Sequence, residues 1–222
     1  MKVVMPYNPK DYSLAVSAAV VLVKLTEMKA ENLYLYGSAE APEIPGKLRE
    51  MGIGYIRSAK DSDKYPLGPN RMFSGLMEAL EDKWREPVFL AEADGFPTCR
   101  DWYERVKLAH EQTTALCSGS WVGWTTPGHY NGNMVIDPKL VKVCPYLKRS
   151  VETAWDVHYA EVFEKYGAPN KEIHNPRRYN VYYPTKFFWE QKGPGGYRPA
   201  WIHGCQGFGV YEKIEREGFG ND

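Results

Sequence analysis

The sequence has no net charge and very little cysteine. Its 28 basic residues are balanced by 28 acidic ones among 222, so the chain as a whole does not attract nucleic acid electrostatically. Its four cysteines form no CxxC pair and show no zinc-like spacing with the histidines. We therefore expect four reduced thiols, with charge available for recognition only as a local patch.

Long hydrophobic runs and common nucleotide signatures are also missing. The longest apolar stretch, residues 14–25, contains Ser17 and Lys24 and is too short to span a bilayer. Met1-Lys2 leads directly into a strand-like run instead of the apolar region of a signal peptide. There is no Gly-rich P-loop, no GxSxG and no dinucleotide fingerprint. We expect a cytoplasmic protein that does not associate with membranes.

The first half alternates between strand and helix patterns. Apolar runs predict strands at 3–5, 32–36, 54–57 and 87–90, with helices at 11–28, at 45–51 and from Pro69 onward. Repeated strand–helix–strand units imply a mainly parallel sheet, which binds ligands beyond the carboxyl ends of its strands. Polar loops follow three of those ends, at Tyr7-Asn8, Gly37-Ser38 and Glu92 to Asp94.

The second half is less regular. Residues 101–116 and 152–166 have helical patterns, and strands at 120–124 and 134–136 surround a Gly/Asn-rich turn. No linker separates two compact parts of the chain, so the pattern indicates one α/β domain over residues 1–222.

The strongest local motif is Glu92-Ala93-Asp94, directly after a buried strand. Alternate residues of an extended segment point the same way, so both carboxylates could meet one ligand. Hard divalent cations such as Mn²⁺ or Mg²⁺ prefer oxygen ligands and neutralise diphosphate charge. The alternative is a pair of solvated loop carboxylates.

This motif resembles the DxD motif of GT-A-fold glycosyltransferases, with Glu92 in place of the first aspartate. The resemblance implies that Asp94 binds the metal directly, whereas Glu92 lies nearer the donor ribose or the water shell of the metal. His203, followed by Gly204, resembles the late histidine that completes the metal site in this family. The alternative for His203 is a partly buried histidine bonded to backbone.

The same resemblance implies a Rossmann-like, mainly parallel sheet in a single GT-A-like domain. Residues 1–98 would form the nucleotide-sugar-binding half and residues 99–222 the less regular acceptor-binding half. The donor, a UDP-sugar above all, would meet the Pro6-Tyr7-Asn8 loop, with Tyr7 stacking on the base. Further candidate donor contacts are Asn70, Arg71, Asn131 and Gly132. Their alternatives are an exposed helix start for Asn70 and Arg71, and a hairpin turn for Asn131 and Gly132.

A carboxylate near the start of a helix often serves as the base in inverting members of this family. Asp156 is the first candidate and Glu152 the second. Both could instead belong to a solvated helix face. Retaining enzymes need no such base, so the stereochemistry stays open.

The segment from Lys171 to His203 has six basic and two acidic residues, interleaved with aromatic ones. Basic groups and aromatic rings together suit a nucleic-acid backbone and an unstacked base. Arg177 and Arg178 would meet phosphates, and Tyr183 or Trp189 would stack on an extruded base. The small size suits a phage enzyme that glycosylates hydroxymethylated pyrimidines in DNA within the host cytoplasm. The alternative is a lid over a small sugar, a glycan or a protein acceptor.

Two other functions share part of this pattern. A nucleotidyltransferase also combines an α/β nucleotide-binding half with carboxylates and a metal, but Pro6-Tyr7-Asn8-Pro9 stands where its Gly-rich basic loop would be. A nucleotide-sugar-binding protein without catalysis is the other alternative.

Overall fold

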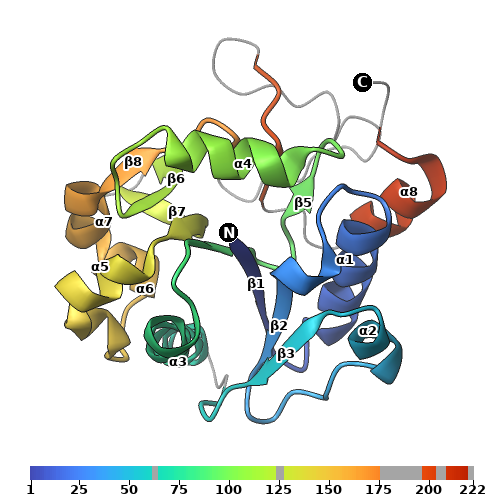
Figure 1. Cartoon of the computed structure of the whole chain (residues 1–222). Helices are drawn as coiled ribbons and strands as arrows, with labels where there is room; N and C mark the ends of the chain where they lie inside the picture. The colour runs from blue at the N-terminus through green and yellow to red at the C-terminus, as the bar shows by residue number, and fades with distance from the viewer. Residues whose placement is uncertain (62–64, 124–127, 176–196, 204–208, 220–222) are drawn as a thin grey trace.

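The computed structural model describes residues 1–61, 65–123, 128–175, 197–203 and 209–219, which form helices around a central sheet (Figure 1). The strands are β1 (Lys2–Tyr7), β2 (Leu33–Gly37), β3 (Gly54–Arg57), β4 (Val88–Leu90), β5 (Phe96–Pro97), β6 (Cys117–Val122), β7 (His129–Ile136), β8 (Gly167–Pro169), β9 (Ile173–His174) and β10 (Trp201–Ile202). The helices are α1 (Tyr12–Lys24), α2 (Gly46–Glu50), α3 (Leu67–Lys83), α4 (Trp102–Glu111), α5 (Pro138–Val143), α6 (Trp155–His158), α7 (Ala160–Tyr166) and α8 (Val210–Glu217), with short 3-10 turns at Ala30–Asn32 and Pro145–Lys148.

The central sheet has seven strands in the order β3-β2-β1-β4-β7-β6-β8. Strands β3, β2, β1 and β4 run parallel, as do β6 and β8, and only β7 runs antiparallel to its neighbours. This confirms the predicted α/β fold with a mainly parallel sheet. A smaller sheet has the order β5-β10-β9, and its strand β5 follows β4 in the chain.

The two faces of the sheet bury two separate hydrophobic clusters. Along β1, Val3 and Met5 belong to the cluster under α1, α4 and α8, whereas Val4 belongs to the cluster under α3, α5 and α7. This alternation follows from the two-residue period of a strand. In Figure 1 α1 and α8 lie on one side of β1, and α3 lies on the other.

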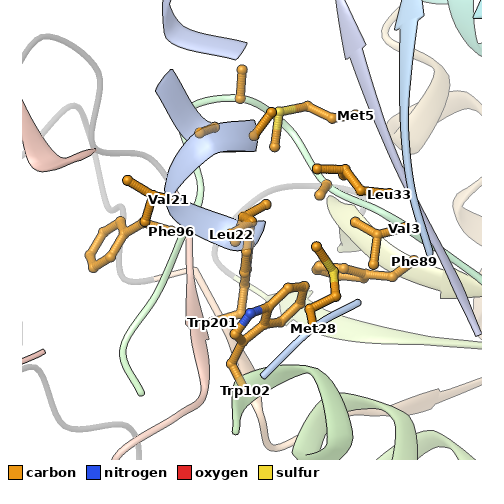
Figure 2. Close-up of a cluster of buried hydrophobic side chains, with 14 of the residues drawn as sticks. Val3, Met5, Val21, Leu22, Met28, Leu33, Phe89, Phe96, Trp102 and Trp201 are labelled. Carbon is orange, nitrogen blue, oxygen red and sulfur yellow. The ribbon is translucent and has the colours of Figure 1, made fainter. Parts of the chain in front are cut away.

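Three large aromatic side chains anchor the first cluster (Figure 2). The ring of Trp201, from β10, lies 4.8 Å from that of Trp102 and 5.2 Å from that of Phe89, between centroids. Trp102 and Trp201 are fully buried. This packing ties the small sheet to the central one, since it joins β10 to β4 and α4.

The predicted strands and helices of the first half are present, with shifted ends. Helix α1 stops at Lys24 and not at residue 28, because the Thr26 hydroxyl donates to the carbonyl of Leu22 and the chain then leaves the helix. In the second half, helix α4 ends at Glu111 instead of residue 116, and the Thr113 hydroxyl donates there to the carbonyl of His110 at 2.8 Å.

The prediction of a helix over 152–166 is wrong at its start and its middle. Residues 152–154 are not helical and include a bend at 152–153, and α6 and α7 are separated at Tyr159. The buried Asn70 carboxamide donates to the carbonyls of Val151 and Thr153 and accepts from the amide of Trp155. These backbone groups are therefore used by Asn70 and not by a continuous helix.

The prediction of a Gly/Asn-rich turn before residue 134 is also wrong. Residues 129–136 form the continuous strand β7, every residue of which is buried, so Asn131 and Gly132 lie inside a strand. The Asn-Gly pair favours a turn locally. Here, the side chain of Asn131 accepts from both the amide and the carboxamide of Asn133, which satisfies these groups within the strand.

An ion pair with a buried carboxylate joins α4 to the segments of the small sheet. Arg105 of α4 donates to Glu172 at 2.7 Å, to the Tyr197 hydroxyl at 2.9 Å and to the carbonyl of Arg198 at 2.8 Å. The Glu172 side chain is 5% exposed, and Tyr197 also donates to it. Arg105 thereby joins the segments that enter β9 and β10. No helix in the described parts of the chain is long and apolar enough to cross a membrane.

We expect Arg105→Met to lower the free energy of unfolding by about 3 kcal/mol, because it leaves the Glu172 carboxylate buried without its cation. Chemical denaturation followed by circular dichroism measures this change. The matched control is Lys107→Met on the same helix, whose partner Glu104 is exposed, and which should change stability by less than about 1 kcal/mol. Equal effects of the two variants would contradict a structural role for Arg105.

Candidate metal and substrate site

A pocket of about 460 Å³ opens beyond the carboxyl ends of β1 and β4. This is where a parallel sheet is expected to bind ligands. The polar side chains that line it are Tyr7, Asn8, Asp11, Tyr65, Asn70, Glu92, Asp94, Asn131, Asp156 and His203. Apolar side chains, chiefly from the start of α3 and from α6, form the remaining wall: Leu14, Pro69, Met72, Phe73, Leu76, Leu90 and Trp155.

Three of these side chains converge as potential metal ligands. Glu92, Asp94 and His203 each offer one ligand atom, and these atoms lie within 4.8 Å of one another. Nε2 of His203 lies 2.8 Å from Oε2 of Glu92 and 3.2 Å from Oδ1 of Asp94. Two carboxylate oxygens suit Mn²⁺ or Mg²⁺, and the imidazole nitrogen beside them favours Mn²⁺, because Mg²⁺ prefers oxygen ligands.

The pairing of β10 with β5 accounts for the arrival of His203. Trp201 lies opposite Pro97 and Ile202 opposite Phe96, so the next residue, His203, comes level with the chain beside Asp94. Gly95 permits this approach, because a Cβ there would lie 2.5 Å from Nε1 of Trp201. The structure thus brings together the three residues that the sequence predicts as metal ligands.

The pocket is strongly acidic. Burial alone would lower the pKa of His203, but Asp94 and Glu92 raise it to about 10. In the apo protein a protonated imidazole therefore offsets one of the two carboxylate charges, and a divalent cation would offset both when His203 is a neutral ligand. Among the described residues that line the pocket there is no lysine or arginine.

Asp11 also lines the pocket, although it is not among the site residues that the sequence predicts. It accepts a hydrogen bond from the Asn8 carboxamide at 2.7 Å. Burial raises its pKa, and the nearby charges of Asp94 and Glu92 raise it further. Its position three residues after Asn8, in the loop that follows β1, was the available signal.

The Pro6-Tyr7-Asn8 loop lines the pocket as expected, but Tyr7 presents little of its ring. Tyr7 is 2% exposed, and its hydroxyl donates to the carbonyl of Pro42 at 2.7 Å. Stacking of Tyr7 on a nucleobase stays a prediction.

The other candidate donor contacts differ in position. Asn131 lines the pocket, and Gly132 faces Glu92. Asn70 also lines the pocket, although its carboxamide holds the backbone before α6. Arg71 is outside the lining and pairs with Asp61 at 2.5 Å.

Of the two candidate bases, only Asp156 reaches the pocket. Burial raises its pKa, and the nearby imidazole of His129, 3.6 Å away, lowers it. Glu152 is exposed, precedes α6 and does not line the pocket. The candidate acceptor contacts Arg177, Arg178, Tyr183 and Trp189 lie outside the described residues.

Neither a known family nor a curated protein matches the sequence, but solved structures match the fold. A mutant of LgtC has a TM-score of 0.58 at 10% identity, and the match covers 97% of this chain and 95% of LgtC. Mouse xyloside xylosyltransferase 1 has a TM-score of 0.54 at 10% identity, with 93% of this chain and 98% of that protein covered.

A third similar structure is the glycosyltransferase GlyE of Streptococcus pneumoniae TIGR4. Its TM-score is 0.50 at 14% identity, and the match covers 91% of this chain. This chain spans about half of GlyE, 54% of its length. At such identities the comparisons establish the fold: a mixed α/β architecture with a mainly parallel sheet, shared with GT-A-type glycosyltransferases.

Proposed function

We propose that the protein is a metal-dependent glycosyltransferase. It transfers a sugar from a nucleotide-sugar donor, a UDP-sugar above all, to a hydroxyl group of the acceptor. The observation that carries the proposal is the convergence of Glu92, Asp94 and His203 in the pocket at the strand ends. The fold supports it, because the similar structures include glycosyltransferases, among them LgtC with donor and acceptor sugar analogues.

The charges around the pocket favour a strict requirement for the metal. Asp11, Glu92, Asp94 and Asp156 all face the space that an anionic diphosphate would enter. Without a cation they would repel it, since no lysine or arginine lines the described part of the pocket. A bound Mn²⁺ or Mg²⁺ supplies charge neutralisation for the diphosphate leaving group.

We infer the orientation of the donor from the order of the residues that line the pocket. The nucleoside lies against the Pro6-Tyr7-Asn8 loop, the diphosphate against Glu92 and Asp94, and the sugar toward Asn131 and Trp155. In the transfer, the bond between the sugar and the diphosphate breaks and a bond to the acceptor oxygen forms. The proton of the acceptor hydroxyl passes to the Asp156 carboxylate, which acts as the general base of an inverting reaction.

We propose hydroxymethylated pyrimidine in DNA as the acceptor. Residues 176–196 contain Arg177, Arg178, Lys186 and Lys192 against one acidic residue, Glu190. Aromatic side chains are interleaved with them, as suits an unstacked base. A small sugar, a glycan or a protein hydroxyl is the alternative acceptor.

We expect slow, sugar-specific hydrolysis of one nucleotide sugar when a panel of donors is incubated with the protein and Mn²⁺. Asp94→Asn or EDTA should lower this hydrolysis at least about 100-fold, because the diphosphate loses its counter-charge. The measurement is released nucleoside diphosphate. Asp82→Asn, an exposed carboxylate on α3, is the control.

Each other outcome of that panel points elsewhere. Full hydrolysis in EDTA contradicts metal dependence. If pyrophosphate is added to the panel, formation of nucleoside triphosphate from a nucleotide sugar identifies a nucleotidyltransferase. Nucleotide binding without turnover of any donor indicates a binding protein.

We expect Asp156→Asn to lower sugar transfer about 10²- to 10⁴-fold and to leave Mn²⁺ affinity unchanged, because the amide cannot accept the proton. Wild-type transfer should be lost as the pH falls through the raised pKa of Asp156, since the base acts only when ionised. The measurement is the transfer rate of the wild type and of Asp156→Asn between pH 4 and pH 8, at intervals of about one pH unit. Glu161→Gln, exposed on α7, is the control. Nearly full transfer by Asp156→Asn would show that Asp156 is not the base.

We expect transfer of labelled sugar to duplex DNA that contains hydroxymethylated pyrimidine. Charge reversal at Arg177 and Arg178 should raise the KM for this DNA and flatten its salt dependence, because fewer counterions are released. Donor hydrolysis should not change. Good hydrolysis with no transfer to any such DNA would exclude this acceptor and leave the transferase proposal intact.

A further inference from the structure

Asn133 is a fully buried polar residue in the middle of β7, next to the apolar Met134, Val135 and Ile136. A buried carboxamide in a central strand is costly unless its hydrogen bonds are satisfied. The carboxamide of Asn133 makes four, two as acceptor and two as donor. Two of the residues that it bonds to, Glu92 and Asn131, line the pocket.

Two of these bonds hold Glu92. Oδ1 of Asn133 accepts from the backbone amide of Glu92 at 3.0 Å, and Nδ2 donates to Oε2 of Glu92 at 2.8 Å. The ladder between β4 and β7 ends at the pair Leu90 and Met134, so the Asn133 side chain continues the pairing beyond it. Backbone and carboxylate of Glu92 are therefore fixed by one side chain.

A third bond connects Asn133 to the strand that carries His203. The indole Nε1 of Trp201 donates to Oδ1 of Asn133 at 3.0 Å. Trp201 precedes His203 by two residues, and Nε2 of His203 lies 2.8 Å from the same Oε2 that Asn133 holds. Asn133 thus hydrogen-bonds both to Glu92 and to the strand that leads to His203, two candidate ligands from distant parts of the chain.

Gly132 completes this arrangement. A Cβ at residue 132 would lie 2.6 Å from Oε1 of Glu92 and 2.9 Å from its Cδ. The missing side chain leaves room for the Glu92 carboxylate against the strand, and Asn133 then fixes its rotation.

We propose that Asn133 is a positioning residue that presents Oε2 of Glu92 to the metal as a direct ligand, beside Nε2 of His203. This inference rests on the proposed function and refines it, because the family resemblance left Glu92 between the ribose and the water shell of the metal. Hydrogen bonds that orient a ligating carboxylate typically change metal affinity 10- to 100-fold when they are removed.

The test is the Mn²⁺ affinity of the full chain without nucleotide, measured from free Mn²⁺ by electron paramagnetic resonance. Asn133→Ala removes the bonds to Glu92, and we expect the Kd to rise about 10- to 100-fold. Gly132→Ala moves the carboxylate from its other side and should raise the Kd in the same direction. This second variant retains Asn133, so it keeps the test valid if Asn133→Ala does not fold.

The control is Asn170→Ala. Asn170 is an equally buried carboxamide, 2% exposed, that bonds to Val106, Ser118 and Glu172 and contacts no candidate ligand. We expect its loss to lower the Tm without changing the Kd for Mn²⁺. A Kd that is unchanged in folded Asn133→Ala and Gly132→Ala, or raised equally in Asn170→Ala, would overturn the inference. No Mn²⁺ binding by the wild type would instead contradict the proposed function itself.

Discussion

The antiparallel pairing of β10 with β5 is the contact on which the candidate site depends. Asp94 lies just before β5, and His203 follows β10, more than a hundred residues later in the sequence. The register that sets Ile202 opposite Phe96 makes these distant residues neighbours. That register is held by Trp201, which packs on Gly95 and on the rings of Phe89 and Trp102, so the hydrophobic core beneath the small sheet determines the geometry of the ligands.

The acidic side chains that are crowded in the pocket explain why the packing beneath the small sheet has to hold the site together. Four carboxylates line the pocket, and they come from the ends of β1 and β4 and from α6: Asp11, Glu92, Asp94 and Asp156. Their negative charges repel one another, so the fold has to hold them together. Burial raises the pKa of Asp11 and Asp156, which shows that the pocket disfavours further negative charge. In the proposed function, a divalent cation would relieve this repulsion and prepare the pocket for an anionic donor, so one ion would serve both stability and binding.

Much of the nucleotide-binding half follows from local sequence patterns. Strands β1 to β4 and the helices between them are short-range features, because apolar periodicity and Pro/Gly boundaries determine them. Three predicted ligands also meet as expected, since the strand before Glu92 fixes the position of the motif. The pairing that completes the ligand set could be anticipated only by resemblance to a family.

The errors arise where long-range hydrogen bonds override local preference. Asn131-Gly132 favours a turn in isolation, yet burial between β4 and β6 makes it strand. The start of α6 is delayed by Asn70, more than eighty residues earlier, which takes up the backbone groups of Val151, Thr153 and Trp155. In both cases the residues that determine the local structure lie far away in the sequence. No pattern within the segment itself therefore predicts these outcomes.

The glutamate at residue 92 is consistent with its surroundings in a way that an aspartate would not be. Its side chain is one methylene longer, and the space that this carboxylate fills exists because residue 132 has no Cβ. A longer side chain also has more rotamers, so its carboxylate needs an external constraint, which the Asn133 carboxamide provides. Glu92, Gly132 and Asn133 therefore form one interdependent unit, in which changing any member alters the position of the oxygen that faces His203.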